Sequence, residues 1–121
     1  GLTVDEIQND RVSVARKFAM KWNHIVVLKG AFTVVANPDG HVTLHPFATS
    51  ALASAGTGDV LAGLIAGLLS QGLKPYDAAV TGVFLHGLAG ELSMSESGES
   101  YSIMASDVLA MIPNAIAMLK Q

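Results

Sequence analysis

A glycine-rich turn followed at once by an apolar helical segment constrains this chain more than any other feature. The turn reads Ala-Ser-Ala-Gly-Thr-Gly-Asp over residues 53–59, and the apolar run continues to Leu69. Gly56 and Gly58 allow the backbone to turn tightly and to approach a ligand without a Cβ in the way. The unpaired N–H groups and the positive end of the dipole of the following helix face the same turn. The stretch therefore predicts an anion site suited to phosphate.

Asp59 is the unexpected residue of this turn. A carboxylate at a helix start is ordinarily a favourable partner for the helix dipole and nothing more. Beside a phosphate site, however, it would repel the ligand unless it had a chemical role. Accepting a proton from a hydroxyl group that attacks a phosphoryl group is such a role. The residues alone leave both interpretations open.

Other polar side chains are possible ligands. Lys29 follows the apolar segment 25–28, where it either meets phosphate as a point charge or simply ends a buried strand. His41 and His45 share one face of a short predicted strand without a third ligand, so no metal-binding side chains are predicted. His86, within a predicted helix, is typical of a hydrogen-bonded packing residue.

The hydrophobic pattern predicts an α/β chain whose few strands come early. The first half contains a helix, a buried strand of the kind found in the middle of a covered parallel sheet, and a hairpin around an Asn-Pro-Asp-Gly turn. Arg11 interrupts the apolar stripe of the first helix. These elements are expected at residues 1–23, 25–28, 34–36 and 41–45.

The second half is predicted to be helical. Gly63 and Gly67 form a GxxxG pair that indicates close helix packing, and Gly72 is expected to end the helix that contains them. Glycines of the next helix are expected to contact that helix, and Pro113 to kink the last one. We expect helices at 58–71, 75 to about 92 and 106 to about 119, with a polar loop at 93–102.

The composition of the chain argues against some classes of function. The chain has 121 residues, 14% of them charged, with a net charge of −3. These values indicate one domain or part of one, and they give no basic field for nucleic acid or for a membrane surface. The absence of cysteine excludes a disulfide framework and fits the cytoplasm.

Three segments together resemble the ADP/ATP-dependent NAD(P)H-hydrate dehydratase family, the carbohydrate-kinase-like domain of the ribokinase superfamily. They are Leu28–Thr33, Ala53–Gly63 and Gly82–Gly90, and the resemblance covers nearly the whole chain. The order and spacing of three motifs make it specific. It implies a ribokinase-like three-layer α/β/α fold, of which residues 1–121 would form a C-terminal part of a single domain.

The resemblance also implies an activity. Family members repair hydrated NADH or NADPH by transferring a phosphoryl group from ADP or ATP to the hydrate hydroxyl, with Mg²⁺ as cofactor; loss of phosphate then restores the nicotinamide. Asp59 would contact the hydrate as base. Gly56, Thr57 and Gly58 would form the anion hole. The nucleotide would be lined by Lys29, Gly30, Ala31, Phe32, Thr33 and Gly58.

Several further expectations follow from the resemblance. Residues 47–52 lack the family's Gly/Asn-Pro-like element, which changes the contacts expected of that loop but not of the turn. The family's domain begins well before Gly1, so we expect residues 1–121 alone to be weakly active or inactive. We expect a homo-oligomer and an epimerase domain or partner; the choice between ADP and ATP stays open. A small-molecule kinase of the same superfamily and a non-catalytic nucleotide-binding module are the alternatives.

Overall fold

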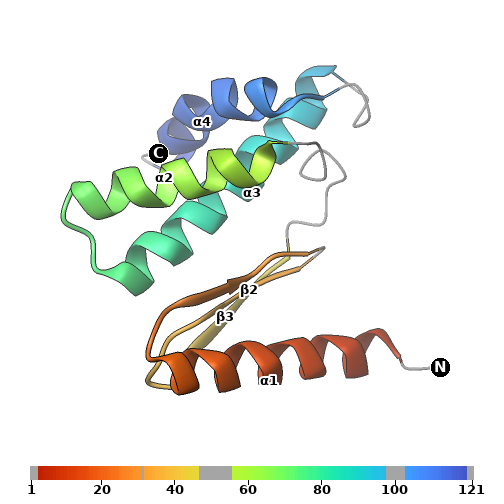
Figure 1. Cartoon of the computed structure of the whole chain (residues 1–121). Helices are drawn as coiled ribbons and strands as arrows, with labels where there is room; N and C mark the ends of the chain where they lie inside the picture. Colours follow the sequence, from red (N-terminus) through yellow and green to blue (C-terminus); the bar gives the residue numbers. More distant parts are fainter. Residues whose placement is uncertain (1–2, 31, 47–55, 98–102, 120–121) are drawn as a thin grey trace.

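The computed structural model describes residues 3–30, 32–46, 56–97 and 103–119. Its elements form three layers: α1 covers one face of a three-stranded sheet, and α2, α3 and α4 lie together over the other face, where Leu61 of α2 and Val83 of α3 pack against Val35 (Figure 1). The predicted α/β/α arrangement is thereby confirmed. The elements are α1 (Val4–Trp22), β1 (Val26–Leu28), β2 (Thr33–Ala36), β3 (Val42–His45), α2 (Thr57–Ser70), α3 (Pro75–Ser97) and α4 (Ala105–Leu119).

The sheet has the order β1-β2-β3, and both pairings are antiparallel. The prediction that the first strand lies inside a parallel sheet is wrong for the described residues, because a short connection to β2 permits only an antiparallel pairing. The predicted turn between β2 and β3 is confirmed. Gly40 adopts φ 97° there, and its N–H donates to the Asn37 carbonyl at 3.0 Å.

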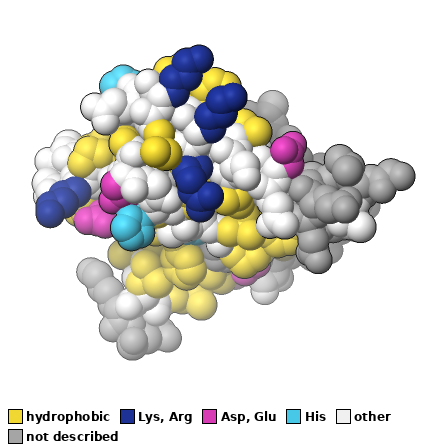
Figure 2. Space-filling view, turned by 90° about the horizontal axis from the view of Figure 1, so that it is seen from below, with side chains coloured by type: hydrophobic (Ala, Val, Ile, Leu, Met, Phe, Trp, Pro, Cys, Tyr) yellow, Lys and Arg dark blue, Asp and Glu magenta, His cyan; other side chains and the backbone are white. Residues whose placement is uncertain are grey.

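Helix α1 approaches the sheet closely because its inner residues are small. Ala15 and Ala19 are buried against Val34 and Ala36 of β2. The opposite side of α1 carries basic and hydrophobic side chains next to one another (Figure 2). The rings of Phe18 and Trp22 lie 4.7 Å apart, one helical turn from each other.

Helix α2 ends and packs partly as predicted. Gly72 has φ 98°, and the N–H of Leu73 donates to the Leu68 carbonyl at 3.3 Å, which closes the helix in the Schellman pattern. The GxxxG prediction is wrong, because Gly63 and Gly67 have open space where a Cβ would stand. The close contact is instead at Gly82 of α3.

A Cβ on Gly82 would collide with Ile65, so this glycine lets α3 approach α2, as expected for a glycine of the second helix. Helix α2 as a whole is less buried than its apolar sequence suggested: only Thr57 and Leu61 are fully buried among its residues. Its glycine face therefore points away from α3.

The predicted polar loop after α3 is wrong over residues 93–97, where α3 continues to Ser97. Ser93 is buried, and its hydroxyl lies 2.9 Å from the Ala89 carbonyl and 3.3 Å from the Asp107 carbonyl. The last helix begins at Ala105 and runs through Pro113. Asp107 caps it by accepting a hydrogen bond from the Met104 N–H at 2.8 Å.

Among the described residues, no helix is both long enough and apolar enough to cross a bilayer.

Candidate functional site

The Gly-Thr-Gly turn forms the start of α2. Gly56 precedes the helix in the left-handed conformation, with φ 89° and ψ −10°. Its carbonyl accepts hydrogen bonds from the N–H groups of Asp59 at 3.1 Å and Val60 at 3.2 Å. A residue with a Cβ would be strained at this φ, and its Cβ would lie 3.2 Å from that of Ala105 at the start of α4. Glycine therefore fixes the direction in which α2 leaves the turn.

Lys29 and Gly58 come together, although they are far apart in the sequence. A Cβ on Gly58 would collide with Nζ of Lys29, so the ammonium group lies directly beside the backbone of the turn. Lys29 itself is exposed at the end of β1. The structure thus joins the predicted lysine to the predicted anion turn, which favours the phosphate interpretation of Lys29 over that of a strand end alone.

His86 of α3 holds the same turn from inside. Its Nε2 lies 2.9 Å from the Thr57 carbonyl, and the ring is buried. Because a carbonyl only accepts hydrogen bonds, Nε2 carries the hydrogen. Burial lowers the pKa of His86; the bond to Thr57 opposes this in part, and the Lys29 ammonium lowers the pKa further. The prediction of a hydrogen-bonded packing histidine is confirmed.

Arg11 of α1 holds the segment that carries Lys29. Its guanidinium donates to the carbonyls of Phe32 at 2.6 Å, Lys29 at 3.1 Å and Leu28 at 3.2 Å. A Cβ on Gly30 would lie 2.5 Å from Nη2 of Arg11, so glycine is what gives the guanidinium room. One arginine side chain therefore binds the backbone on both sides of residue 31, at Lys29 and at Phe32.

Three of the remaining predicted site residues, Asp59, Phe32 and Thr33, lie in the described part of the chain. Asp59 is exposed in the first turn of α2, where a carboxylate also suits the helix dipole. Thr33 begins β2 opposite His45, and Phe32 is half-buried. Ala31 and residues 47–52 lie outside the described part of the chain.

The other histidines do not join the site. His45 is buried, and its Nε2 lies 2.9 Å from the Thr43 hydroxyl; burial lowers its pKa. His41 instead pairs with the Asp39 carboxylate at 3.1 Å on the surface. The hydrogen bond from the His41 N–H lowers the pKa of Asp39. Across the described ranges, no three His, Asp or Glu side chains are grouped as metal ligands.

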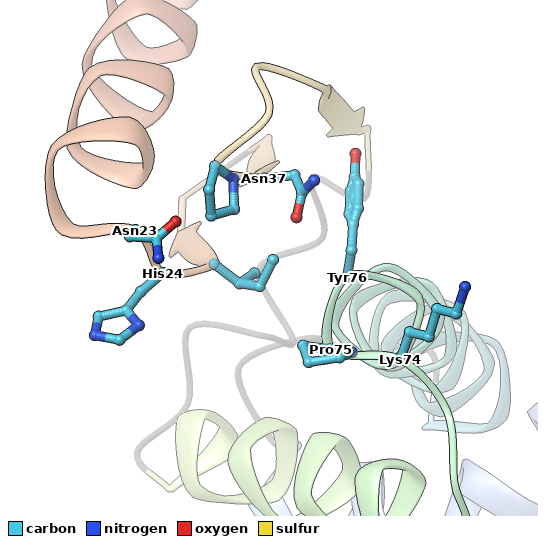
Figure 3. Close-up of a pocket in the computed structure, with 8 residues that line it drawn as sticks. Asn23, His24, Asn37, Lys74, Pro75 and Tyr76 are labelled. Carbon is cyan, nitrogen blue, oxygen red and sulfur yellow. The ribbon is translucent and has the colours of Figure 1, made fainter.

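A cleft of about 390 Å³ lies at the opposite end of the sheet. Three turns meet there: the one after α1, the one between β2 and β3, and the one before α3. In Figure 3, Asn37 and Tyr76 lie opposite each other, while His24 and Lys74 extend away from them. None of the residues that line this cleft was predicted as a site residue.

The sequence did not predict that Arg11 binds the backbone around Lys29. It predicted a hydrogen-bonded His86 but not that the bond goes to the Gly-Thr-Gly turn. The signal for Arg11 was present, because a charged residue interrupted the apolar stripe of a helix that precedes a strand end. Which carbonyls it meets depends on how α1 lies on the sheet. That arrangement is tertiary, and hydrophobic periodicity does not report it.

Comparison with known proteins agrees with this geometry. A family model described as NAD(P)H-hydrate dehydratase matches residues 1–114. The chain is 45% identical, over its whole length, to the bifunctional NAD(P)H-hydrate repair enzyme Nnr of Moorella thermoacetica, of which it spans 23%. Over 89% of its length it is 38% identical to the ADP-dependent (S)-NAD(P)H-hydrate dehydratase of Neisseria meningitidis, of which it spans 36%.

A solved structure gives the same result. The Bacillus subtilis ADP/ATP-dependent NAD(P)H-hydrate dehydratase, co-crystallised with ATP and Mg²⁺ and soaked with CoA, matches 98% of this chain. The TM-score is 0.85 at 35% identity, and the match covers 43% of that protein. The described elements therefore have the fold of the corresponding part of that enzyme.

Proposed function

Because the chain belongs to the NAD(P)H-hydrate dehydratase family, we propose that its protein repairs hydrated NADH and NADPH at the expense of ADP or ATP. The observation that carries this proposal is the contact between the Lys29 ammonium and the Gly58 backbone. It puts a positive charge beside a helix start, and both groups attract phosphate. The chain spans well under half of the relatives it matches, so the proposal concerns the whole protein.

In the proposed reaction, Asp59 is the base. It takes the proton of the hydrate hydroxyl while that oxygen bonds to the terminal phosphorus of the nucleotide and the phosphoanhydride bond breaks. The C–O bond of the phosphorylated hydrate then breaks, phosphate leaves, and loss of a proton from the adjacent carbon restores the ring double bond. The exposure of Asp59 at the start of α2 supports this role, because the carboxylate can meet a substrate.

The other residues bind and orient the phosphates. Gly56, Thr57 and Gly58 supply backbone N–H groups at the start of a helix, where partial positive charge gathers. Lys29 balances the phosphate charge from the sheet side. The nucleotide is proposed to lie along Gly30, Ala31, Phe32 and Thr33.

Mg²⁺ fits this arrangement as a companion of the nucleotide. It is usually held in part by substrate phosphates and water, and the phosphates at the turn of residues 56–58 would hold it here. The metal would supply neutralisation of charge on the phosphates. It requires no separate group of protein ligands.

The test supplies hydrated NADH with ADP or ATP and Mg²⁺ to the whole protein. Return of the nicotinamide absorbance together with free phosphate is the expected result, and comparing the two nucleotides identifies the donor. A stable phosphorylated product would instead indicate a small-molecule kinase. No consumption of nucleotide would indicate a binding module.

We also propose a cytoplasmic homo-oligomer that works with an epimerase, as a fused domain or as a partner. The apolar face that α2 leaves exposed supports an association. Light scattering of the whole protein would test the oligomeric state, and conversion of the other hydrate epimer would test the epimerase.

A further inference from the structure

Arg11 is a charged side chain of α1 that contacts the backbone next to the residues proposed to line the nucleotide. It belongs to α1, and it donates to three carbonyls of the connection between β1 and β2. It points at backbone oxygens, which carry partial negative charge, and its planar fork suits several acceptors at once. We infer that Arg11 is a positioning residue, which holds the backbone of Lys29 and Phe32 so that the Lys29 ammonium stands at the phosphate turn.

The contacts on both sides of the connection support this inference. On one side, the guanidinium occupies the space that a Cβ of Gly30 would need. On the other side, the Lys29 ammonium occupies the space that a Cβ of Gly58 would need. The carbonyl of Lys29 is bound by Arg11 at 3.1 Å, so the backbone of the lysine is fixed where its side chain begins. A long, flexible side chain placed from a fixed backbone loses fewer orientations when it meets a ligand.

Arg16 provides a matched control on the same helix. Its Nε donates to the Gly40 carbonyl at 3.1 Å, at the opposite end of the hairpin. Arg11 and Arg16 are therefore both α1 arginines bound to hairpin carbonyls. They differ in the connection that they bind. Arg11 binds the connection that carries Lys29, the residue next to Gly58, whereas Arg16 binds the turn between β2 and β3.

The first test compares R11K and R11M with R16M in the whole protein. Binding of ATP and of ADP is measured by calorimetry without the hydrate, so the result does not depend on the proposed reaction. We expect R11M to weaken nucleotide binding at least about ten-fold, because it removes every hydrogen bond to the three carbonyls. R11K should weaken it less, because an ammonium still donates to some of them but lacks the planar fork of a guanidinium. R16M should bind like the unchanged protein. Equal binding by R11M and R16M would overturn the inference.

The second test separates positioning from stability. If turnover is present, R11M should raise the nucleotide KM while kcat changes little, and added guanidinium ion should restore part of the affinity of R11A. A variant that loses only thermal stability, with its nucleotide affinity intact, would contradict a positioning role. A protein that lacks dehydratase activity but shows the R11M binding defect would overturn the proposed function and leave this inference standing.

A double-substitution cycle uses Gly30. In the presence of Arg11, G30A should weaken nucleotide binding because the new methyl group displaces the guanidinium. In the R11A background the same change should cost much less, since the colliding group is gone. Equal losses in both backgrounds would show that Gly30 serves the ligand directly, and the inference would fail. The single variant G30A keeps Arg11, so its binding can be measured even where R11M folds poorly.

Discussion

The two ends of the hairpin sheet are built from similar parts but differ in what those parts allow. At the end that we call the nucleotide end, Arg11 reaches the carbonyls around Gly30, and Lys29 meets Gly58. At the other, which we call the turn end, Arg16 reaches the carbonyl of Gly40. Both glycines stand next to an arginine of α1, yet they are needed for different reasons.

Gly40 is needed for its conformation, because φ is 97° there and open space surrounds the position of a Cβ. Gly30 is needed for close approach, because a Cβ would collide with Arg11. Replacing a glycine that is needed for its backbone conformation should cost stability alone. Replacing a glycine that is needed for a close contact should move the charged group beside it, and binding should change. Single substitutions at the two ends should therefore differ in what they change.

The largest effect is expected for D59N at the nucleotide end. Loss of a general base should lower kcat by about 10²–10⁴-fold, while the nucleotide still binds because the glycine turn and Lys29 are intact. Turnover of hydrated NADH and calorimetry with ATP would be measured side by side. Full activity of D59N would reject the base assignment.

Next, G58A should weaken nucleotide binding by roughly ten-fold or more. The added methyl group would take the place of the Lys29 ammonium, and the charged contact to phosphate that we propose for Lys29 would be lost. K29A should have a similar effect, and K29A combined with G58A should be little worse than either alone. Additive losses would mean that the two residues act separately.

At the turn end, G40A should change stability instead. A residue with a Cβ costs roughly 1–2 kcal/mol in the left-handed region, so the free energy of unfolding should fall by about that amount. Urea denaturation would measure it, and nucleotide binding should remain unchanged. Weaker nucleotide binding by a folded G40A would remove the distinction between the two ends.

Acid should destabilise the fold through both buried histidines. The pKa values of His86 and His45 are lowered, so below about pH 6.5 the unfolded chain binds protons that the folded chain does not. The free energy of unfolding should therefore decrease from pH 7 to 5, by at most about 1.4 kcal/mol per pH unit for each histidine. H86Q should flatten this dependence, because it removes one of the two buried imidazoles.

The smallest effect is expected for K74A beside the cleft at the turn end. Lys74 is exposed and extends away from Asn37 and Tyr76 (Figure 3). Turnover and nucleotide binding should stay within about two-fold of the unchanged protein, as is usual for a surface substitution. A larger loss of turnover or of nucleotide affinity would mean that a change at the cleft affects the nucleotide end.

The sequence was most informative where a local rule determines the structure. The Asn-Pro-Asp-Gly turn, the end of α2 at Gly72 and the helix start after Gly56 were all predicted, because each depends on the conformations open to a few neighbouring residues. The end of α3 was not predicted. Ser93 looked like a loop residue, but its hydroxyl is buried between two backbone carbonyls, and α3 continues beyond it.

The site followed the same division. Gly56, Thr57, Gly58 and Asp59 form one continuous turn, and a motif shows them together. The approach of Lys29, the hydrogen bond from His86 and the bonds from Arg11 depend on how three layers pack. The antiparallel pairing of β1 was not predicted, for a related reason. A short apolar strand has the same sequence pattern in a parallel and in an antiparallel sheet.

The order of the strands also bears on how the chain acquires its structure. Within the described sheet, β1 pairs with β2 and β2 with β3, so every pairing joins neighbours along the chain through a short connection. Closing short loops costs little entropy, and such local pairings form quickly. During synthesis, α1 and the hairpin can therefore assemble before α3 emerges. The arginine contacts of the sheet would then precede the phosphate turn, which would be added to a connection already in place.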